Sequence, residues 1–145
     1  MQALAARAFE LLAEQVDTVP QTEDPVNDLL VTGFVGFRGY ALEHPDLFRL
    51  VLGSAFPTFR LGEEASRAGT AAFTRLTGRV ARAQATDRLL AEKCDSIAFQ
   101  LYATALGLCT LELCGMIATT EAESVWRSLF ATLVSGWNRA ISASE

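Results

Sequence analysis

The sequence predicts an all-α fold of about six helices, and three observations lead to this prediction. Half of the 145 residues are hydrophobic, which provides a sizeable core for one domain, residues 1–145. Apolar residues recur at intervals of three and four along most of the chain, as they do on one face of a helix. Alternating apolar-polar segments and hairpin dipeptides such as Asn-Gly, which would indicate strands, are missing.

The first half of the chain contains three predicted helices. Residues 2–16 carry apolar residues at helical spacing, and no capping residue precedes them, so this helix begins without an N-cap. Asp24 and Pro25 supply an N-cap acceptor and a favoured first residue for a second helix, which is expected to reach His44. A proline follows and breaks that helix, and residues 45–52 form a short third one.

The fourth predicted helix spans residues 63–84 and lies on the surface. Its apolar residues form one stripe that faces the core. Its charged residues form an opposite face that we expect to lie in water, and these residues are Glu64, Arg67, Arg75, Arg79 and Arg82. The preceding connection, residues 54–62, contains Phe56 and Phe59, which we expect to pack inward because large aromatic side chains rarely gather in water.

The stretch Ile97–Ala118 is the most hydrophobic of the chain and lies in a fifth predicted helix that begins at Leu89. Glu112 is its only charged residue, so the helix is expected to be buried on nearly every side. A membrane span needs about 20 predominantly apolar residues. Because Gln100 and Glu112 interrupt this run and Lys93 flanks it, we interpret it as the core helix of a soluble protein rather than a membrane span.

The last predicted helix runs to about Ala140, and Thr120 with Glu123 matches a capping box at its start. Two adjacent rows of apolar residues run along this helix, and together they form a face wider than one neighbouring helix can cover. The sequence therefore predicts burial against a second copy of the chain, a homodimer. The expected interface combines these rows with a side of small residues on the previous helix: Ala103, Gly107, Thr110, Cys114, Trp126, Phe130, Leu133, Val134, Trp137 and Ile141.

Charge and cysteine content exclude some classes of function. The net charge of −5, without a run of Lys or Arg, argues that this chain alone does not bind DNA. The three cysteines are odd in number and lie on or near one apolar helix, so we expect reduced, structural thiols in a cytoplasmic protein. No secretion signal opens the chain.

Catalytic and metal-binding patterns are also missing. His44 is the only histidine and lies at a helix end before a proline, which is typical of a structural residue. No nucleophile is paired with a base, no cluster of carboxylates or metal ligands has the needed spacing, and no Gly-rich phosphate loop follows a strand. We therefore expect neither an enzyme nor a bound metal or cofactor.

Apolar and aromatic side chains from five segments could converge on a ligand cavity, as they do between the helices of bundles. The alternative is that they pack a solid core. Arg38 and Tyr102 are the polar residues expected to orient a ligand, although Arg38 could equally cap a helix end or pair with Glu43. The lining favours an apolar or aromatic small molecule. The candidate residues are Phe34, Phe37, Arg38, Phe48, Phe56, Phe59, Phe73, Leu76, Phe99 and Tyr102.

Two parts of the sequence resemble the C-terminal domain of TetR-type transcriptional regulators. The string LYATALGLCTLELCG resembles the Trp-x-x-x-His-Gly region of one subgroup, with Tyr102, Leu106 and Gly107 at the signature positions. Any polar contact that the family His makes with a ligand or in packing is thus absent, and Leu106 joins the candidate ligand-binding residues. The second part resembles three consecutive features of the family: an Asp-Pro helix start, a helix with an aromatic-Arg pair, and an Ala-x-x-x-Pro-x-aromatic-Arg-Leu continuation. The matching residues here are Asp24 and Pro25; Phe37 and Arg38; and Ala41, Pro45, Phe48, Arg49 and Leu50.

The resemblance implies an effector-binding and dimerisation domain, a TetR C-terminal-like bundle whose last two helices form a four-helix dimer interface. It also implies that a ligand between the helices shifts the first helix, which in such regulators follows an N-terminal helix-turn-helix module. That module is absent from this sequence, so DNA would be contacted only through a domain outside this chain. The alternative is a stand-alone helical protein that binds a small molecule or pairs with a regulator without binding DNA.

Overall fold

A computed structural model describes residues 2–52, 62–86 and 93–144 of the chain. Helices make up nearly all of these residues and no strand occurs among them, which confirms the predicted all-α fold. Six helical stretches lie in this part of the chain, and three of them combine α-helix with π-helical (η1, η2) or 3₁₀ (η3) turns. Their elements are α1 (Gln2–Asp17); α2 (Pro25–Val31), η1 (Thr32–Phe37) and α3 (Arg38–Glu43); α4 (Pro45–Leu47) and η2 (Phe48–Leu52); α5 (Glu63–Thr86); α6 (Cys94–Leu113); and η3 (Thr119–Glu121) with α7 (Ala122–Ser144).

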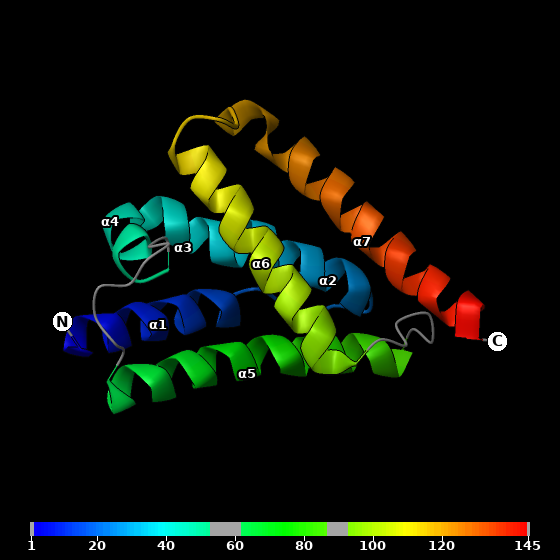
Figure 1. The fold of residues 1–145 in the computed structure, drawn as a ribbon, viewed down its shortest axis with the longest axis horizontal. Helices are drawn as coiled ribbons and strands as arrows, with labels where there is room; N and C mark the ends of the chain where they lie inside the picture. Colours follow the sequence, from blue (N-terminus) through cyan, green and yellow to red (C-terminus); the bar gives the residue numbers. More distant parts are fainter. Residues whose placement is uncertain (1, 53–61, 87–92, 145) are drawn as a thin grey trace.

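The helices form two unequal groups. α1 and α5 lie side by side, and the continuous helix α2–η1–α3 packs against both of them (Figure 1). α6 crosses this group and contacts α5, η1 and α3. α7 follows a turn at the end of α6, diverges from it, and meets the rest of the molecule again at α2 (Figure 1). Each of the last two helices therefore has one side packed on the chain and one side left exposed.

The second helical stretch begins and ends where the sequence predicts. The carboxylate of Asp24 accepts a hydrogen bond from the backbone N–H of Asn27 at 3.1 Å, and Pro25 occupies the first helical position. Glu43 is the last helical residue, because His44 before the proline leaves helical geometry with φ −128°. The π-helical turn η1 in the middle of this stretch was not predicted.

Gly33 in η1 allows α7 to approach this helix closely. A Cβ atom at this position would lie 2.7 Å from a ring carbon of Trp126, a distance that no real side chain tolerates. The indole of Trp126 is accordingly buried against η1, with 6% of its surface exposed. Gly33 thus lets Trp126 of α7 pack directly on η1.

The predicted boundary between the last two helices is wrong. α6 ends at Leu113, because Gly115 adopts φ +82° and the N–H groups of Met116 and Ile117 turn back to the carbonyl of Leu111. No side chain caps the 3₁₀ turn that leads into α7. The expected capping box is therefore absent, and Glu123 pairs instead with Arg127 one turn later, at 3.0 Å.

The predicted water-facing side of α5 is wrong for two of its arginines. Arg67 and Arg75 are exposed, but Arg79 is only 8% exposed and Arg82 is half-buried. Arg82 extends to α2, where it pairs with the buried Asp28 at 3.1 Å. Long arginine stems can cross an apolar face and deliver the guanidinium to polar groups beyond it.

α6 is not buried on every side within one chain. Its inward side carries Ile97, Ala98, Ala105, Leu108 and Cys109, all at most 5% exposed. Its opposite side, with the small residues predicted for close packing, is exposed. Among the described helices, α6 is the one that is long and apolar enough to cross a membrane by length and composition. Yet its buried glutamate and its packing on α5, η1 and α3 are those of a helix in a protein core.

Candidate ligand-binding cavity

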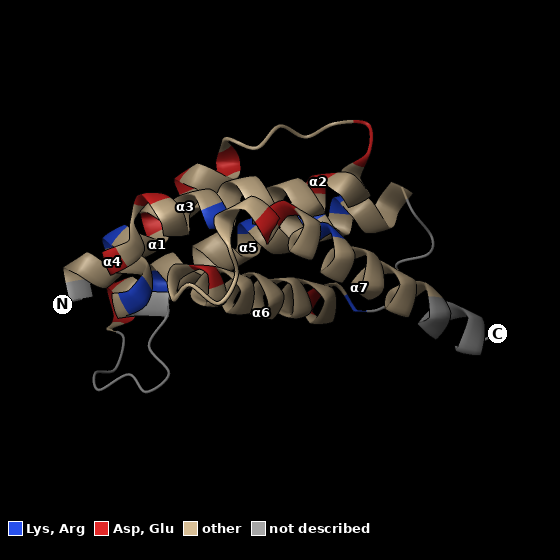
Figure 2. Cartoon of the chain, turned by 90° about the horizontal axis from the view of Figure 1, so that it is seen from above, with Lys and Arg blue, Asp and Glu red and all other residues tan. Residues whose placement is uncertain are grey.

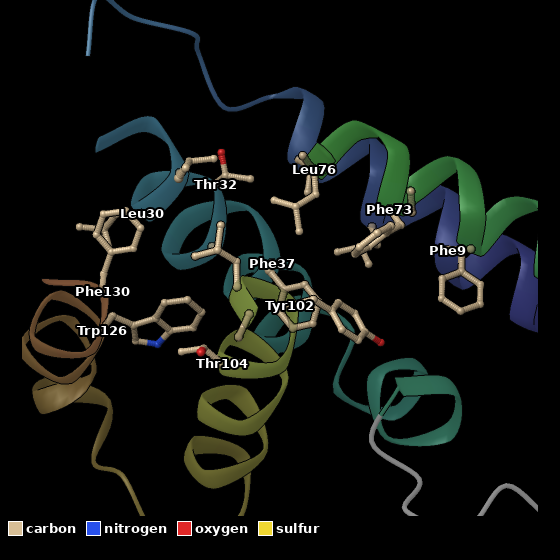
Figure 3. Close-up of a pocket in the computed structure, with 18 of the residues that line it drawn as sticks. Phe9, Leu30, Thr32, Phe37, Phe73, Leu76, Tyr102, Thr104, Trp126 and Phe130 are labelled. Carbon is tan, nitrogen blue, oxygen red and sulfur yellow. The ribbon is translucent and has the colours of Figure 1, made fainter. Parts of the chain in front are cut away.

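A cavity of about 510 Å³ lies between the helices, within the size range of small-molecule sites. Figure 3 shows its labelled side chains facing one common space from separate helices. The walls come from α1, the α2–η1 helix, α5, α6 and α7. The residues that line it are Phe9, Leu12, Val16, Leu29, Leu30, Thr32, Gly33, Phe37, Ser66, Gly69, Thr70, Ala72, Phe73, Leu76, Leu101, Tyr102, Thr104, Ala105, Trp126, Phe130 and Leu133.

The lining is apolar, with a few hydroxyl groups. None of the described residues in it is Asp, Glu, Lys, Arg or His. Its side-chain oxygens are those of Thr32, Ser66, Thr70, Tyr102 and Thr104. A cavity of this composition suits an uncharged molecule that is mostly hydrocarbon, because a buried charge without a partner is strongly destabilised.

Four of the residues predicted for a ligand site line this cavity: Phe37, Phe73, Leu76 and Tyr102. The rings of Phe37 and Phe73 meet the Tyr102 ring edge to face, with centroids 6.0 Å and 6.5 Å away. Phe48, which was also predicted, lies behind this cluster. It packs edge to face on Phe37 at 6.0 Å and is only 1% exposed, so it supports the wall without reaching the cavity.

Other predicted ligand residues lie elsewhere. Phe34 packs edge to face on Trp126, with ring centroids 6.0 Å apart, and Leu106 packs against the core beside the cavity. Phe99 is 64% exposed on the outer side of α6, so its assignment to the ligand site is wrong. Phe56 and Phe59 lie outside the described residues.

Arg38 does not reach the cavity, contrary to its predicted role in orienting a ligand. Its guanidinium forms two hydrogen bonds with the carboxylate of Glu112, at 2.8 Å and 2.9 Å, and lies 4.7 Å over the ring of Phe34. The Glu112 side chain is 2% exposed and that of Arg38 is 14% exposed. This buried pair joins α3 to α6, and neither predicted alternative for Arg38, a helix cap or a pair with Glu43, is present.

Many of the lining residues were not predicted as ligand residues, and those of α1 and α5 show why. Phe9, Leu12 and Val16 come from α1 and lie one helical turn or so apart. Their spacing does predict an inward-facing stripe, but it does not distinguish a cavity wall from solid packing. The small α5 residues Gly69 and Ala72 leave the space that these side chains surround, a feature no residue type indicates by itself.

The residues predicted for a dimer interface divide into exposed and buried groups. On α6, Ala103, Gly107, Thr110 and Cys114 are exposed. On α7, four predicted residues face inward: Trp126 and Trp137 are at most 6% exposed, and Phe130 and Leu133 line the cavity. Val134 is half-buried, and the side chain of Ile141 lies outside the described part of the chain. The prediction is therefore wrong for the two tryptophans, because a single chain already buries them.

Trp137 is held by α6 rather than by a partner chain. Its indole N–H donates to the side-chain oxygen of Gln100 at 2.9 Å, and its ring belongs to a core cluster with Leu29, Val80 and Ile97. The inner apolar row of α7 therefore covers the cavity and this cluster. The outer row, represented by the 38% exposed Leu129, stays at the surface.

Arg79 connects the cavity wall to the end of α1. Its guanidinium donates to the hydroxyl of Thr32 at 3.2 Å, and to the backbone carbonyls of Val16 and Val19 at 3.0 Å and 2.8 Å. Thr32 and Val16 both line the cavity. The Thr32 hydroxyl in turn donates to the carbonyl of Asp28 at 2.6 Å. A buried cation thus donates to one carbonyl in the last turn of α1 and to one just beyond it, where intrahelical donors run out.

Within residues 2–52, 62–86 and 93–144, no group of three His, Cys, Asp or Glu side chains is placed to hold a metal ion. The buried cysteine also lacks the features of a reactive thiol, since burial and the neighbouring carboxylate of Glu112 raise the pKa of Cys109 to about 12.

Apolar cavities between the helices of a bundle are typical places for small molecules to bind. The comparison with protein families agrees, because residues 30–134 match the family described as the tetracyclin repressor-like C-terminal domain. The chain belongs to this family, which confirms the resemblance seen in the sequence, although the Trp-x-x-x-His-Gly signature of a subgroup is not shown. Domains of this family are regulatory and typically dimeric, and they bind small-molecule effectors. No curated protein and no solved structure matches the chain significantly.

Proposed function

We propose that this chain is the effector-sensing and dimerisation domain of a cytoplasmic TetR-like transcriptional regulator, and that it binds an apolar or aromatic small molecule. The observation that carries the proposal is the cavity, whose apolar wall combines α1 with both of the last two helices. A ligand there would contact α1 and the helices expected to form the dimer at the same time. Residues 1–145 would act as one domain.

Two sets of contacts support transmission from the cavity to α1. Phe9, Leu12 and Val16 would contact the ligand directly. Arg79 ties the end of α1 to Thr32 in the opposite wall. A ligand that binds one position of α1 better than another shifts the population toward that position, to the extent of the difference in affinity. In a regulator with a DNA-binding module ahead of α1, this shift would move the module.

The exposed side of α6 supports a homodimer. Ala103, Gly107, Thr110 and Cys114 lie along it, and a Cβ atom added at Gly107 would meet nothing within 4 Å in the same chain. Figure 2 shows that charged residues gather on α1 to α5, and that α6 and α7 carry few. Small side chains and low charge would let α6 and α7 of two copies pack as a four-helix bundle.

The alternative is a stand-alone helical protein that binds a small molecule, or pairs with a regulator, without DNA. Both proposals include ligand binding in the cavity, but in the alternative, ligand binding does not change an affinity for DNA. The same domain fused behind a helix-turn-helix module, tested for ligand-dependent release from DNA, distinguishes the two: a domain that binds ligand without changing DNA affinity would favour the alternative.

Binding of a neutral aromatic probe, N-phenyl-1-naphthylamine, tests the cavity directly, since its fluorescence rises in an apolar site. We expect the native chain to bind this probe. Ala72→Phe should weaken binding roughly tenfold or more, because Ala72 lines the cavity and the added ring occupies it. Ala71→Phe is the matched control, since its neighbour Ala71 is exposed on α5 and does not line the cavity.

Two results would count against an effector site in this cavity. One is a native chain that does not bind the probe. The other is equal loss of binding in the two alanine variants, which would place the probe on the surface or indicate a general loss of structure. Circular dichroism of both variants separates these last two causes.

A further inference from the structure

Tyr102 is held in one orientation by the aromatic residues around it. Its ring lies between Phe37 and Phe73, which meet it at interplanar angles of 86° and 89°. Phe37 in turn rests on the fully buried Phe48. Edge-to-face contacts of this kind favour defined ring positions. Figure 3 shows Tyr102 close to Phe37 within the cavity wall. The hydroxyl at the end of this ring is therefore placed by the wall and not by a polar partner.

The Tyr102 hydroxyl has no hydrogen-bond partner among the described residues. Tyr40 also has an unpaired hydroxyl, but that atom is sealed in the core, whereas Tyr102 lines the cavity. Burial raises the pKa of Tyr102, so its hydroxyl stays protonated and able to donate near neutral pH. The Tyr102 hydroxyl is not among the fully buried unpaired atoms, so water can reach it when the cavity holds no ligand. A ligand that displaces this water leaves the donor unpaired unless the ligand supplies an acceptor.

Of the four other hydroxyl groups of this wall, three are occupied or open to water, and the fourth, that of half-buried Thr104, has no hydrogen-bond partner among the described residues. The hydroxyl of Thr32 already donates to the carbonyl of Asp28 and accepts from Arg79. Ser66 and Thr70 are exposed residues of α5. Tyr102 and Thr104 therefore carry the free hydroxyls of the described lining, and Tyr102 is the one whose ring is held between two aromatic neighbours.

The charged side chains nearest to the wall already have partners within the protein. The Arg38 guanidinium is paired with Glu112, and Arg79 is bound to backbone carbonyls and a hydroxyl. An ionised ligand would enter a cavity lined by no opposite charge among the described residues, and it would lose its hydration without compensation.

We infer that the effector is an uncharged, mostly apolar molecule with an oxygen acceptor, such as a ketone or ester carbonyl, that receives a hydrogen bond from the Tyr102 hydroxyl. This inference rests on the proposed function and specifies the ligand class of the same cavity. Tyr102 would determine specificity by favouring carbonyl compounds over hydrocarbons of similar size, because a hydrocarbon would leave the hydroxyl without a partner.

Three fluorescent probes test the inference. The first is the neutral ketone 6-propionyl-2-(dimethylamino)naphthalene, whose emission moves to longer wavelength when its carbonyl accepts a hydrogen bond. The second is N-phenyl-1-naphthylamine, which has no carbonyl. The third is its sulfonated relative 1-anilinonaphthalene-8-sulfonate, which differs mainly by a negative charge.

Tyr102→Phe should weaken binding of the ketone probe about three- to tenfold, the effect of one hydrogen bond, and move its emission to shorter wavelength. The affinity for N-phenyl-1-naphthylamine should change much less, which also reports that the cavity keeps its shape. Tyr40→Phe removes the sealed hydroxyl outside the cavity and should leave the ketone emission as in the native chain. The sulfonated probe should bind the native chain at least about tenfold more weakly than its neutral relative.

The outcomes separate the inference from the proposed function. If the ketone probe binds Tyr102→Phe with native affinity and emission, the hydrogen bond is absent and the inference is overturned, although the cavity still binds ligands. If the sulfonated probe binds as tightly as the neutral one, the restriction to uncharged ligands is overturned. If neither neutral probe binds the native chain, the proposed function fails and the inference fails with it.

Discussion

Helices α1 and α5 are joined by polar contacts within the chain, whereas α6 and α7 diverge and each keep one side that no part of the chain covers. On the first pair, Arg79 satisfies the end of α1 and Arg75 pairs with Asp17 across the two helices at 2.9 Å. On the second pair, the outer side of α6 presents small residues, and Phe99 and Leu129 are exposed. The difference suggests that the first pair is stabilised internally, while the second pair is completed by another molecule.

Glu112 anchors α6 to the rest of the chain, and its loss should have the largest effect on stability. Glu112→Leu leaves the mostly buried Arg38 guanidinium without a carboxylate, and we expect the free energy of unfolding to fall by about 3 kcal/mol or more. Denaturant unfolding at one protein concentration measures the change. The double variant Arg38→Met with Glu112→Leu should recover much of the loss, since neither charge then remains buried. A double variant no more stable than the single one would show that the pair is not the cause.

Arg79 tests the internal stabilisation of the first pair. Arg79→Met keeps an apolar stem but removes the described donor to the Val19 carbonyl and one of two donors to the Val16 carbonyl, and it should lower the free energy of unfolding by about 2 kcal/mol. Arg75→Met is the control, because it breaks an exposed pair between the same two helices and should cost less than about 1 kcal/mol. If both variants lost the same free energy of unfolding, the prediction that the buried Arg79 stabilises the fold more than the exposed Arg75 would be wrong.

Arg79 also shows where sequence pattern stops being informative. The helices themselves follow from apolar spacing and from proline and glycine positions, since both act locally along the chain. The position of the Arg79 guanidinium depends on which carbonyls of the neighbouring segment face α5. The pattern of residues along α5 contains no information on that segment. The exposed assignment was therefore wrong, although the helix was predicted nearly to its last residue.

The candidate site was predictable in part for the same reason. Phe37, Phe73 and Tyr102 are large and inward-facing, so their spacing indicates a shared interior. Whether that interior is filled depends on the sum of all surrounding side-chain volumes, to which the α7 residues Trp126 and Phe130 contribute from far along the sequence. Those two were assigned to a dimer interface because an apolar row does not specify which neighbour covers it.

Gly107 tests whether the uncovered side of α6 is completed by a second copy. Gly107→Leu would insert a large side chain between the proposed partner helices, and the dimer dissociation constant should rise roughly tenfold or more. Gly78→Leu is a matched control, because Gly78 is also a helical glycine whose added Cβ would meet nothing within 4 Å. Sedimentation velocity over a range of concentrations measures both.

The structure also corrects what Gly107→Leu does within one chain. A close neighbour in the same chain would make the added side chain overpack, but no atom of this chain lies within 4 Å of a Cβ added at Gly107. The monomer should therefore be unchanged or slightly stabilised, by up to about 1 kcal/mol, because glycine is unfavourable inside a helix. A native chain that stays monomeric at micromolar concentration, or a dimer unaffected by the leucine, would contradict the proposed interface.

The smallest expected effect concerns the acid stability of the α2–α5 contact, through Asp28. Burial raises the pKa of this carboxyl, but its hydrogen bonds with Thr22 and its pairing with Arg82 outweigh burial and hold the pKa below the ordinary value of 3.8. A carboxyl with a lowered pKa in the folded state stabilises the fold fully above the unfolded-state pKa. That contribution is lost as the pH falls below about 4 and through the folded-state value.

Comparison of the native chain with Asp28→Asn isolates this contribution from the other carboxylates. The variant should be less stable by about 1 kcal/mol near neutral pH, and the difference should shrink between about pH 4 and pH 2 as Asp28 becomes protonated in the native chain. Urea unfolding at a series of pH values gives the difference directly. A difference that stays constant down to pH 2 would mean that the charge of Asp28 does not stabilise the contact between α2 and α5, and that its hydrogen bonds with Thr22 are sufficient.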